Sequence, residues 1–509
     1  MDVGSNPTTS IIIHVIFYKI GIKMKFNIIT GPLEKQNVSC IITAIFNNNE
    51  LSHTTKILDK ISNNYISNTI KNLNNEIIDS LILYNIPNIY SNKIILINCK
   101  NKNNLSKSDY KKIINNSLQI IKKTNSQSAL YLINNDCNIK NQNIFYNTKN
   151  LIININEEIY SFNKYKTENN NFILKNIIIY STKHELNNIQ KSIKYGIIIS
   201  KSIKYTKDLS NHSINTFTSS YFSNEVHNLS KIYKNLSIKI IEKKEIKKLK
   251  INSILTLKKK NLKKSKIIIL KYNNNITQKP IVIIDKGIIF NDNNILNKKR
   301  YNIHNINSIL GIFIFILELK IKINIIGIIP SIENDLNNKK NKNYNIIKTM
   351  LGKTIEILNN EIKEKIILCD ILTYSQKYNP MVIIDITFFN NTIIFLGKNY
   401  NALYSNNSKL ANDLIIAGKM INDLCWKMPL QKKYNKNNNN LTDIKNTENT
   451  NENTLEFASL LSKFTKNTPW AHIDISGTIT KIKNNNEEIT GRPIKLLIQY
   501  IINLASTFK

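Results

Sequence analysis

Three groups of polar residues between positions 280 and 370 have types and an order that could support metal-dependent hydrolysis. Lys286 lies in Asp-Lys-Gly at the end of an apolar run, and Lys298 follows in Asn-Lys-Lys. The run 359–365 reads Asn-Asn-Glu-Ile-Lys-Glu-Lys and precedes a second apolar segment. A two-metal hydrolase holds its cations about 3.5–4 Å apart around a bridging water, and it needs several anionic oxygens for this. The order of the groups fits such a site, but most of the required carboxylates are missing.

The elements that must position these residues follow from the pattern of apolar runs. Strand-like runs alternate with helical patterns, which predicts an α/β fold with a mainly parallel sheet covered by helices. In the first part of the chain we predict strands at 24–46, 93–99, 129–133 and 151–155 and helices at 53–72 and 107–123. After a helix at 185–209, we predict strands at 267–272, 280–290, 323–330, 381–389 and 392–396 and helices at 306–320 and 411–422.

These elements form two predicted domains. Residues 24–170 are predicted to form a small N-terminal three-layer α/β domain, which ends in the polar stretch near 164–171. Residues 171–509 are predicted to form a larger C-terminal α/β domain with a mixed, mainly parallel sheet. Residues 1–23 lack the basic start of a signal peptide, and Met24 is a more natural first residue, so we predict a non-native N-terminal extension. The Asn-rich segment 434–453 is predicted to be a surface loop.

The composition explains the charge of the chain. Hydrophobic residues make up 42% of 509 residues, enough for two or three packed domains. Glycine is scarce and arginine occurs only at Arg300 and Arg492, whereas Asn, Ile and Lys, the amino acids of AT-rich codons, are abundant. We therefore interpret the formal net charge of +36 as lysine accumulation on solvated faces, although a basic surface can also hold a nucleic-acid backbone.

The cysteines and the lengths of the apolar runs indicate in which cellular compartment the protein lies. Five scattered cysteines without a Cys-x-x-Cys pair fit a reducing cytoplasm and argue against a disulfide framework. No apolar run approaches the ~20 residues that a membrane span requires. The sequence therefore predicts a cytoplasmic protein.

Several ordered motifs resemble the leucine aminopeptidase (cytosol aminopeptidase) family of bacterial type, from Met24 to the end of the chain. The most specific are Trp470-Ala-His-Ile-Asp-Ile-Ser-Gly-Thr and Thr490-Gly-Arg-Pro. Earlier motifs are Gly31-Pro-Leu-Glu-Lys-Gln, Lys207-Asp-Leu-Ser-Asn, Met350-Leu-Gly-Lys and Leu368-Cys-Asp-Ile-Leu-Thr-Tyr. The resemblance implies a hexameric cytoplasmic metallopeptidase that removes N-terminal residues from peptides with a free N-terminus. It also implies two divalent cations, manganese or zinc.

The resemblance also assigns positions to the site. The family's metal ligands are one lysine, three aspartates and one glutamate, and a second lysine and an arginine assist catalysis. Lys286 and Glu361 stand at ligand positions with a usable side chain. Three ligand positions are substituted, namely Asn291, Ser308 and Lys363, and the assisting positions carry Lys298 and Lys365.

These substitutions remove the charge that would hold the metals. The family's four acidic ligands carry −4, whereas Asn291, Ser308, Glu361 and Lys363 together carry no net charge. An ammonium at position 363 would repel each cation, since unit charges at ~4 Å repel by about 4 kcal/mol at an effective dielectric of 20 and a dication doubles this. Two metals are therefore not expected to bind tightly, and we predict an impaired or inactive peptidase.

Two alternatives stay open at this point. Asp292 and Glu364 could act with Glu361 as a shifted ligand set, although neighbouring side chains of an extended segment point to opposite sides. The chain could instead be a non-catalytic hexameric scaffold or a DNA-binding accessory protein. Among other residues, His472 is predicted to be structural, Arg492 to form a buried or interface ion pair, and Trp426 and Trp470 to anchor the core.

Overall fold

The computed structural model divides the chain into two compact units, residues 1–201 and 202–509. The backbone is described at 13–14, 24–73, 78–100, 105–140, 142–167, 174–213, 216–256, 262, 264–275, 277–285, 287–290, 296–334, 345–357, 360–388, 395–430, 443, 453–483 and 485–507. Side-chain surroundings are described for the same residues except 13–14, 288–290, 296–306, 333–334, 345, 357, 360–365 and 453.

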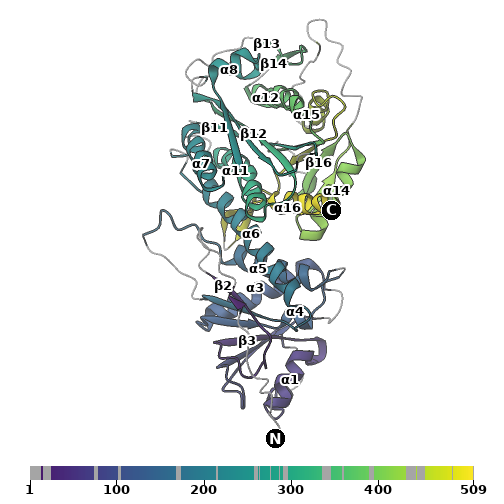
Figure 1. The fold of residues 1–509 in the computed structure, drawn as a ribbon. Coiled ribbons are helices and arrows are strands. Elements are labelled where there is room, and N and C mark those ends of the chain that lie inside the picture. Colours follow the sequence, from purple (N-terminus) through teal and green to yellow (C-terminus); the bar gives the residue numbers. More distant parts are fainter. Residues whose placement is uncertain are drawn as a thin grey trace. The chain divides into compact units, whose positions relative to one another are not determined.

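The first unit is a three-layer α/β sandwich around a seven-stranded sheet (Figure 1). In sheet order its strands are β1 (Ile13–His14), β2 (Lys25–Ile29), β7 (Asn176–Tyr180), β6 (Ser128–Tyr131), β3 (Cys40–Ile45), β5 (Lys93–Asn98) and β4 (Ser80–Tyr84). The five inner strands pair in parallel and the two outer ones pair antiparallel. Helices α1 (His53–Ile61) and α2 (Tyr65–Lys71) contribute to the core on one face of the sheet. Helices α3 (Lys107–Lys123), α4 (Ile133–Asp136), α5 (Ile144–Ile159) and α6 (Leu186–Ser210) contribute to the core on the other.

The predicted elements of this unit are confirmed with one exception. The helix predicted at 107–123 has the bounds of α3, and the helix predicted at 53–72 is divided into α1 and α2. The strand predicted at 151–155 is wrong, because these residues lie inside α5. Asn143 caps that helix through its side-chain oxygen, which accepts the backbone N–H of Tyr146 at 3.2 Å. In a chain so rich in isoleucine, an apolar β-branched run does not distinguish a buried helix from a strand.

Lys149 on α5 is a buried cation that links pH to stability. It is 1% exposed, and its Nζ lies 4.4 Å from the centroid of the Tyr146 ring. Burial, with the neighbouring Lys107 ammonium as a smaller cause, lowers the pKa of Lys149 to about 7. Between that value and the ordinary lysine pKa of about 10.4, the unfolded chain carries a proton that the folded chain lacks. The free energy of unfolding therefore rises with pH across this window.

We expect Lys149 to contribute a rise of about 1 kcal/mol in the free energy of unfolding per pH unit between pH 7 and pH 9. Urea denaturation at pH 7, 8 and 9, followed by circular dichroism, should show this rise in the natural chain and a flatter profile in Lys149→Met. Lys112→Met is the control, because the Lys112 side chain is 81% exposed. An unchanged pH profile in Lys149→Met would refute the assignment.

The second unit is built on a nine-stranded mixed sheet. Its main path runs β17 (Cys425–Lys427), β16 (Asn401–Ser405), β18 (Trp470–Asp474), β15 (Val382–Thr387), β10 (Ile281–Asp285), β12 (Asn324–Asn334), β9 (Lys266–Asn273) and β8 (Leu236–Ile241). Strand β11 (Gly287–Phe290) pairs with the second half of β12. Strands β18, β15, β10, β12 and β11 are parallel, whereas β16, β9 and β8 join through antiparallel pairs. The predicted mixed, mainly parallel α/β class is confirmed.

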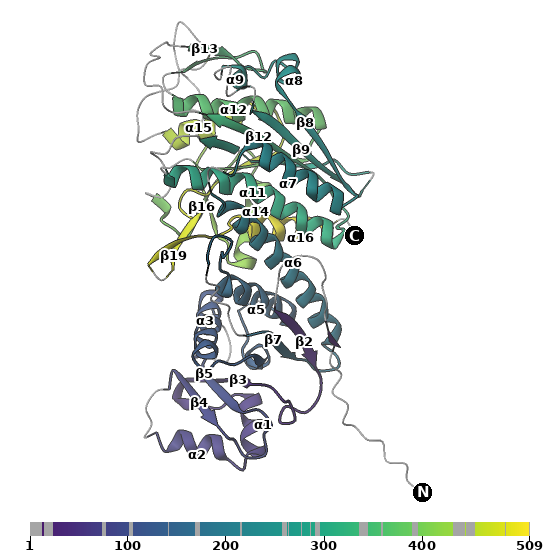
Figure 2. The same cartoon turned by 90° about the vertical axis from the view of Figure 1, so that its left-hand side faces the viewer.

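Helices cover both faces of this sheet, as Figure 2 shows around β12. One face packs on α12 (Asn360–Ser375), α15 (Asn453–Ser462), α8 (Lys243–Lys248) and α9 (Asn252–Leu255). The other face carries α11 (Leu296–Leu319), which approaches so closely that a Cβ at Gly327 would lie 2.8 Å from Ile309. The remaining helices are α7 (Ser219–Ile232), α14 (Ser408–Ile421) and α16 (Ile494–Thr507). Two hairpins, β13 (Asn345–Lys348) with β14 (Thr354–Ile357) and β19 (Thr480–Lys483) with β20 (Asn486–Ile489), complete the unit.

Several predictions for this unit need correction. The strand predicted at 280–290 is divided into β10 and β11, and the helix predicted at 306–320 begins ten residues earlier as α11. The strand predicted at 392–396 lies largely outside the described residues, and its last two residues are helical. Trp470 is fully buried as predicted, but Trp426 is 56% exposed because it lies on the edge strand β17. The segment 434–453 lies outside the described residues except Asp443 and the backbone of Asn453.

Candidate functional site

In the second unit, the order in which the chain adds strands to the sheet reverses at β10. This reversal identifies the edge of the sheet where a ligand site is expected. The chain leaves β10 through α11 and returns in β12 on one side, then crosses through α12 to β15 on the other side of β10. The two crossover helices therefore lie on opposite faces of the sheet. In open α/β sheets, ligands bind outside the carboxyl ends of the strands at such a switch point. Asp285, at the end of β10, is fully buried at this position.

The predicted site residues lie on segments that belong to this edge. Lys286 directly follows β10, and Asn291 and Asp292 precede α11, but all three lie outside the described residues. Lys298 lies in the first turn of α11, which starts from the carboxyl edge because the helix leads back to the beginning of β12. Ser308 lies further along α11 and is fully buried. The topology thus groups these segments at one edge of the sheet.

The run 361–365 is helical, which changes the argument about a shifted ligand set. Helix α12 begins at Asn360 at the carboxyl edge and ends near the start of β15. Positions 364 and 365 follow position 361 by three and four residues, so a helical backbone places both on the side of position 361, and position 363 lies on another side. The assumption of an extended segment was wrong here. Glu361 and Glu364 are neighbours on one helical face, but neither takes the place of Lys363.

A buried polar network links β15 and β18 on the α12 side of the sheet. The register aligns Asp385 with His472, and both are fully buried. Asp385 Oδ2 accepts the Trp470 indole N–H at 2.5 Å, and its Oδ1 contacts His472 Nδ1. The other ring nitrogen of His472 lies 3.3 Å from the Thr387 hydroxyl. His472 is therefore a structural residue, in agreement with the prediction, and its network fixes β15 to β18.

Asp370 is a second buried carboxylate with a structural task. Its two oxygens accept the backbone N–H and hydroxyl of Ser253, at 2.9 and 2.6 Å, and the backbone N–H of Met350 at 2.6 Å. Burial raises the pKa of this carboxyl, and the hydrogen bonds from Ser253 and Met350 oppose the shift. Asp370 thus ties α12 to α9 and to the turn that joins β13 and β14.

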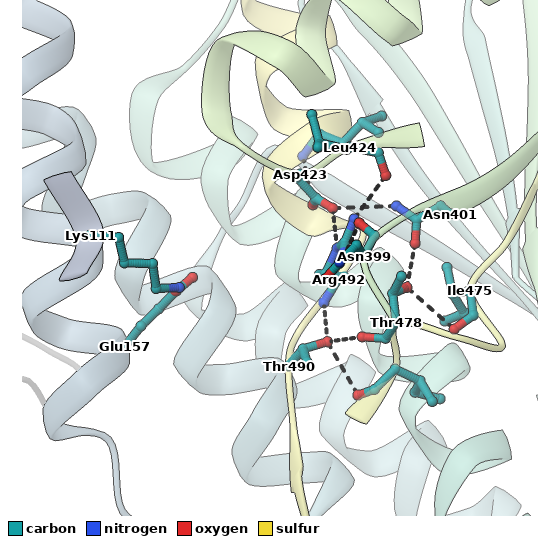
Figure 3. A network of polar contacts seen from close by, with 12 residues as sticks. Lys111, Glu157, Asn399, Asn401, Asp423, Leu424, Ile475, Thr478, Thr490 and Arg492 are labelled. Carbon is teal, nitrogen blue, oxygen red and sulfur yellow. Dashed lines mark hydrogen bonds and ion pairs between the residues drawn. The ribbon is translucent and has the colours of Figure 1, made fainter. Parts of the chain in front are cut away.

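Arg492 forms the buried ion pair that the sequence predicted (Figure 3). Its Nε donates to Asp423 Oδ1 at 2.5 Å, and Nη2 donates to the Leu424 carbonyl at 2.8 Å. Asp423 Oδ2 also accepts the Leu496 N–H at 3.2 Å, which connects α16 to the end of α14. Its described partners are protein groups, so we assign Arg492 a structural role.

The acids and histidines with described side chains do not form a metal centre. Among them, no three are grouped closely enough to hold a cation. The ligand position with described surroundings, Ser308, offers a buried neutral hydroxyl in place of a carboxylate. The described side chains alone therefore supply no ligand set for two divalent cations. Sequence reasoning missed Asp285 and Asp385, although an acid inside an apolar strand is a recognisable signal, since burying a carboxylate is costly.

Comparison with known proteins covers both units. Residues 204–498 match the catalytic domain of the cytosol aminopeptidase family, and residues 42–169 match the N-terminal domain of the same family. A probable cytosol aminopeptidase of Buchnera aphidicola subsp. Baizongia pistaciae is 34% identical over 499 residues, which cover 94% of this chain and 99% of the relative. A probable cytosol aminopeptidase of Blochmanniella floridana is 33% identical over 95% of this chain and 99% of its own length.

Solved structures show the same fold. A point mutant of tomato leucine aminopeptidase superposes with a TM-score of 0.80 at 17% identity, covering 96% of this chain and 98% of the other. The bottromycin maturation enzyme BotP superposes with a TM-score of 0.76 at 12% identity, covering 92% of this chain and 100% of the other. At these identities the likeness concerns the fold alone. Among the described residues, no helix has the length and apolar character needed to cross a membrane.

Proposed function

This chain belongs to the cytosol aminopeptidase family, and from that premise we propose a leucyl-aminopeptidase-like protein whose dimetal hydrolysis is impaired or lost. Its substrates or ligands would be peptides with a free N-terminus, in intracellular peptide turnover. We place it in the cytoplasm, as the family name implies. The proposal concerns the chemistry at positions 286–365, since family membership already accounts for the fold.

The observation that carries the proposal is the loss of negative charge at the ligand positions. Asn291, Ser308, Glu361 and Lys363 sum to zero where the resemblance implies four acids. Ser308 is fully buried, and its hydroxyl brings no charge to the position. A buried cation is stable only where it is paired with opposite charge, and here an ammonium takes one of the ligand positions.

A shifted ligand set is the strongest competing account. Glu361 and Glu364 occupy one helical face of α12, and Asp292 precedes α11, so three carboxylates could in principle hold one cation. Lys286, Lys298 and Lys365 add positive charge to the same segments. We therefore favour loss of tight metal binding, with the assisting positions Lys298 and Lys365 left without the metal-bound substrate that they would serve.

Metal stoichiometry tests the proposal directly. The purified chain is loaded with manganese or zinc, desalted and subjected to elemental analysis, and hydrolysis of a leucyl substrate is followed in parallel. We expect close to no bound metal per chain and little hydrolysis, because charge at the site does not balance two dications. Two metals per chain with hydrolysis would overturn the proposal, and one metal with hydrolysis would establish the shifted ligand set.

Assembly belongs to the same proposal. We propose a homo-hexamer, as the resemblance implies, which would persist as a scaffold if hydrolysis is lost. Light scattering on the metal-free chain measures its mass, and a monomer would contradict a scaffold role. A DNA-binding accessory role has no support beyond the net charge of +36. Sequence-dependent binding would be needed to favour it over lysine accumulation.

A further inference from the structure

Three lysines of the second unit converge on two tyrosines at the edge where the parallel strands begin. Lys271 comes from β9, Lys377 from the short 3-10 helix η3 (Gln376–Tyr378), and Lys239 from β8. The Nζ atoms of Lys271 and Lys377 each lie 4.9 Å from the centroid of the Tyr378 ring. The two ammonium groups are therefore within twice that distance of each other.

The tyrosines hold this cluster in place. Lys377 Nζ lies 3.6 Å from the centroid of the Tyr374 ring and contacts the Tyr374 hydroxyl. Tyr374 is 1% exposed at the end of α12, and its ring meets Tyr378 edge-on at 6.2 Å between centroids. Cation–π contacts with both rings favour an ammonium at this position. The site is thus built on the buried Tyr374 and the half-buried Tyr378.

Positive charge exceeds negative charge in this cluster. The carboxylate of Glu245 on α8 contacts Lys239 at 2.5 Å. Its negative charge also acts to raise the pKa of Lys377 and of both tyrosines. Burial, followed by the neighbouring Lys239 and Lys271, lowers the pKa of Lys377. Three ammonium groups facing one carboxylate leave an excess of two positive charges. Helix α8 adds four more lysines beside Glu245.

We propose that Lys239, Lys271 and Lys377, arranged around Tyr374 and Tyr378, form a binding site for a small multivalent oxyanion of the phosphate class. The buried Tyr374 hydroxyl accepts from Lys377 Nζ, so the tyrosine positions the ammonium group and the lysines supply the donors for the anion. Ammonium groups bind phosphate as point charges and need no bidentate alignment. The site is separate from the candidate peptidase site, because α12 ends at this edge and begins at the other.

Isothermal titration of the full chain with pyrophosphate, at constant ionic strength, tests the assignment, with inorganic phosphate as a second probe. We expect saturable binding of one pyrophosphate and at least about tenfold weaker binding in Lys271→Met/Lys377→Met, because two charged donors are lost. The matched control is Lys56→Met/Lys112→Met, which removes the same charge from exposed lysines of the first unit and should bind as the natural chain does.

A conservative variant separates binding from folding. Lys377→Arg keeps the charge and should retain most of the affinity, whereas Lys377→Met should lose it at an unchanged unfolding temperature. If the control pair weakens pyrophosphate binding equally, the affinity depends only on the overall charge of the chain. That result would overturn the proposal. Binding of a DNA duplex without any response to pyrophosphate would also overturn it, since the site would then serve a polymer.

Discussion

Restoring three acidic side chains should produce a chain that retains two manganese ions after desalting, where the natural chain retains close to none. The variant is Asn291→Asp/Ser308→Asp/Lys363→Glu, with Glu361 left in place. It changes the net charge of the four ligand positions from zero to −4. At ~4 Å and an effective dielectric of 20, one unit charge and a dication interact by about 8 kcal/mol. Even a small fraction of this interaction energy is enough to convert weak manganese binding into tight binding.

The expected gain in manganese affinity is at least about a thousandfold, since each 1.4 kcal/mol corresponds to a factor of ten. It is measured by elemental analysis and by the manganese-dependent rise in unfolding temperature, because a ligand that binds only the folded state stabilises it. Without metal the triple variant should be less stable than the natural chain. Ser308 is fully buried, so the Ser308→Asp change would place an unpaired carboxylate in the interior.

The control for this experiment makes the same charge change elsewhere. Lys60→Glu/Lys112→Glu alters the net charge by the same amount at exposed positions of the first unit and should bind no manganese tightly. A restored variant that still binds no metal would show that more than these side chains has been lost, for example the geometry of the segment 286–295. Recovery of leucyl hydrolysis would further show that Lys298 and Lys365 can still assist.

The fold could be predicted wherever an element was bounded by polar or capping residues. Helix α3 was predicted with its observed bounds, since Ser106 caps it through its side chain and two lysines occupy its last turn. Inside apolar runs the prediction was less accurate. Residues 151–155 were assigned to a strand because a run of five residues, most of them isoleucine, has no clear period. These residues are helical, and Leu151, Ile152 and Ile155 of α5 pack into the core against the sheet.

The candidate site, like the fold, could be predicted only in part. The order of Lys286, Lys298 and Glu361 along the chain indicated segments that the topology brings to one sheet edge, because strand ends at a switch point gather there. The helical character of the run 361–365 was missed, although the asparagines before it are favoured N-cap residues and glutamate and lysine are good helix formers. The sequence also offers no reason to place Trp426 on an exposed edge strand, because sheet order depends on long-range pairing.

Replacing Asp385 by alanine is expected to cost the largest share of stability of any single change in the second unit. Asp385 is fully buried and serves two donors, the Trp470 indole and His472, so Asp385→Ala leaves both without their acceptor. Each buried donor left without an acceptor costs about 1–3 kcal/mol of unfolding free energy, and this change leaves two. Asp385→Asn keeps the shape and one acceptor oxygen and should lose less, about 1–2 kcal/mol.

Tryptophan fluorescence offers a specific measurement, because the chain has only two tryptophans and both lie in the second unit. In a Trp426→Phe background the signal comes from Trp470 alone, and urea denaturation then reports the network itself. The matched control is Asp443→Ala. Asp443 also accepts two hydrogen bonds, from the N–H and hydroxyl of Thr354 at 2.8 and 2.9 Å, but it is exposed, so its loss should be small. Equal losses at Asp385 and Asp443 would show that burial does not set the strength of these contacts. The argument that β15 and β18 are fixed through Asp385 would then fail.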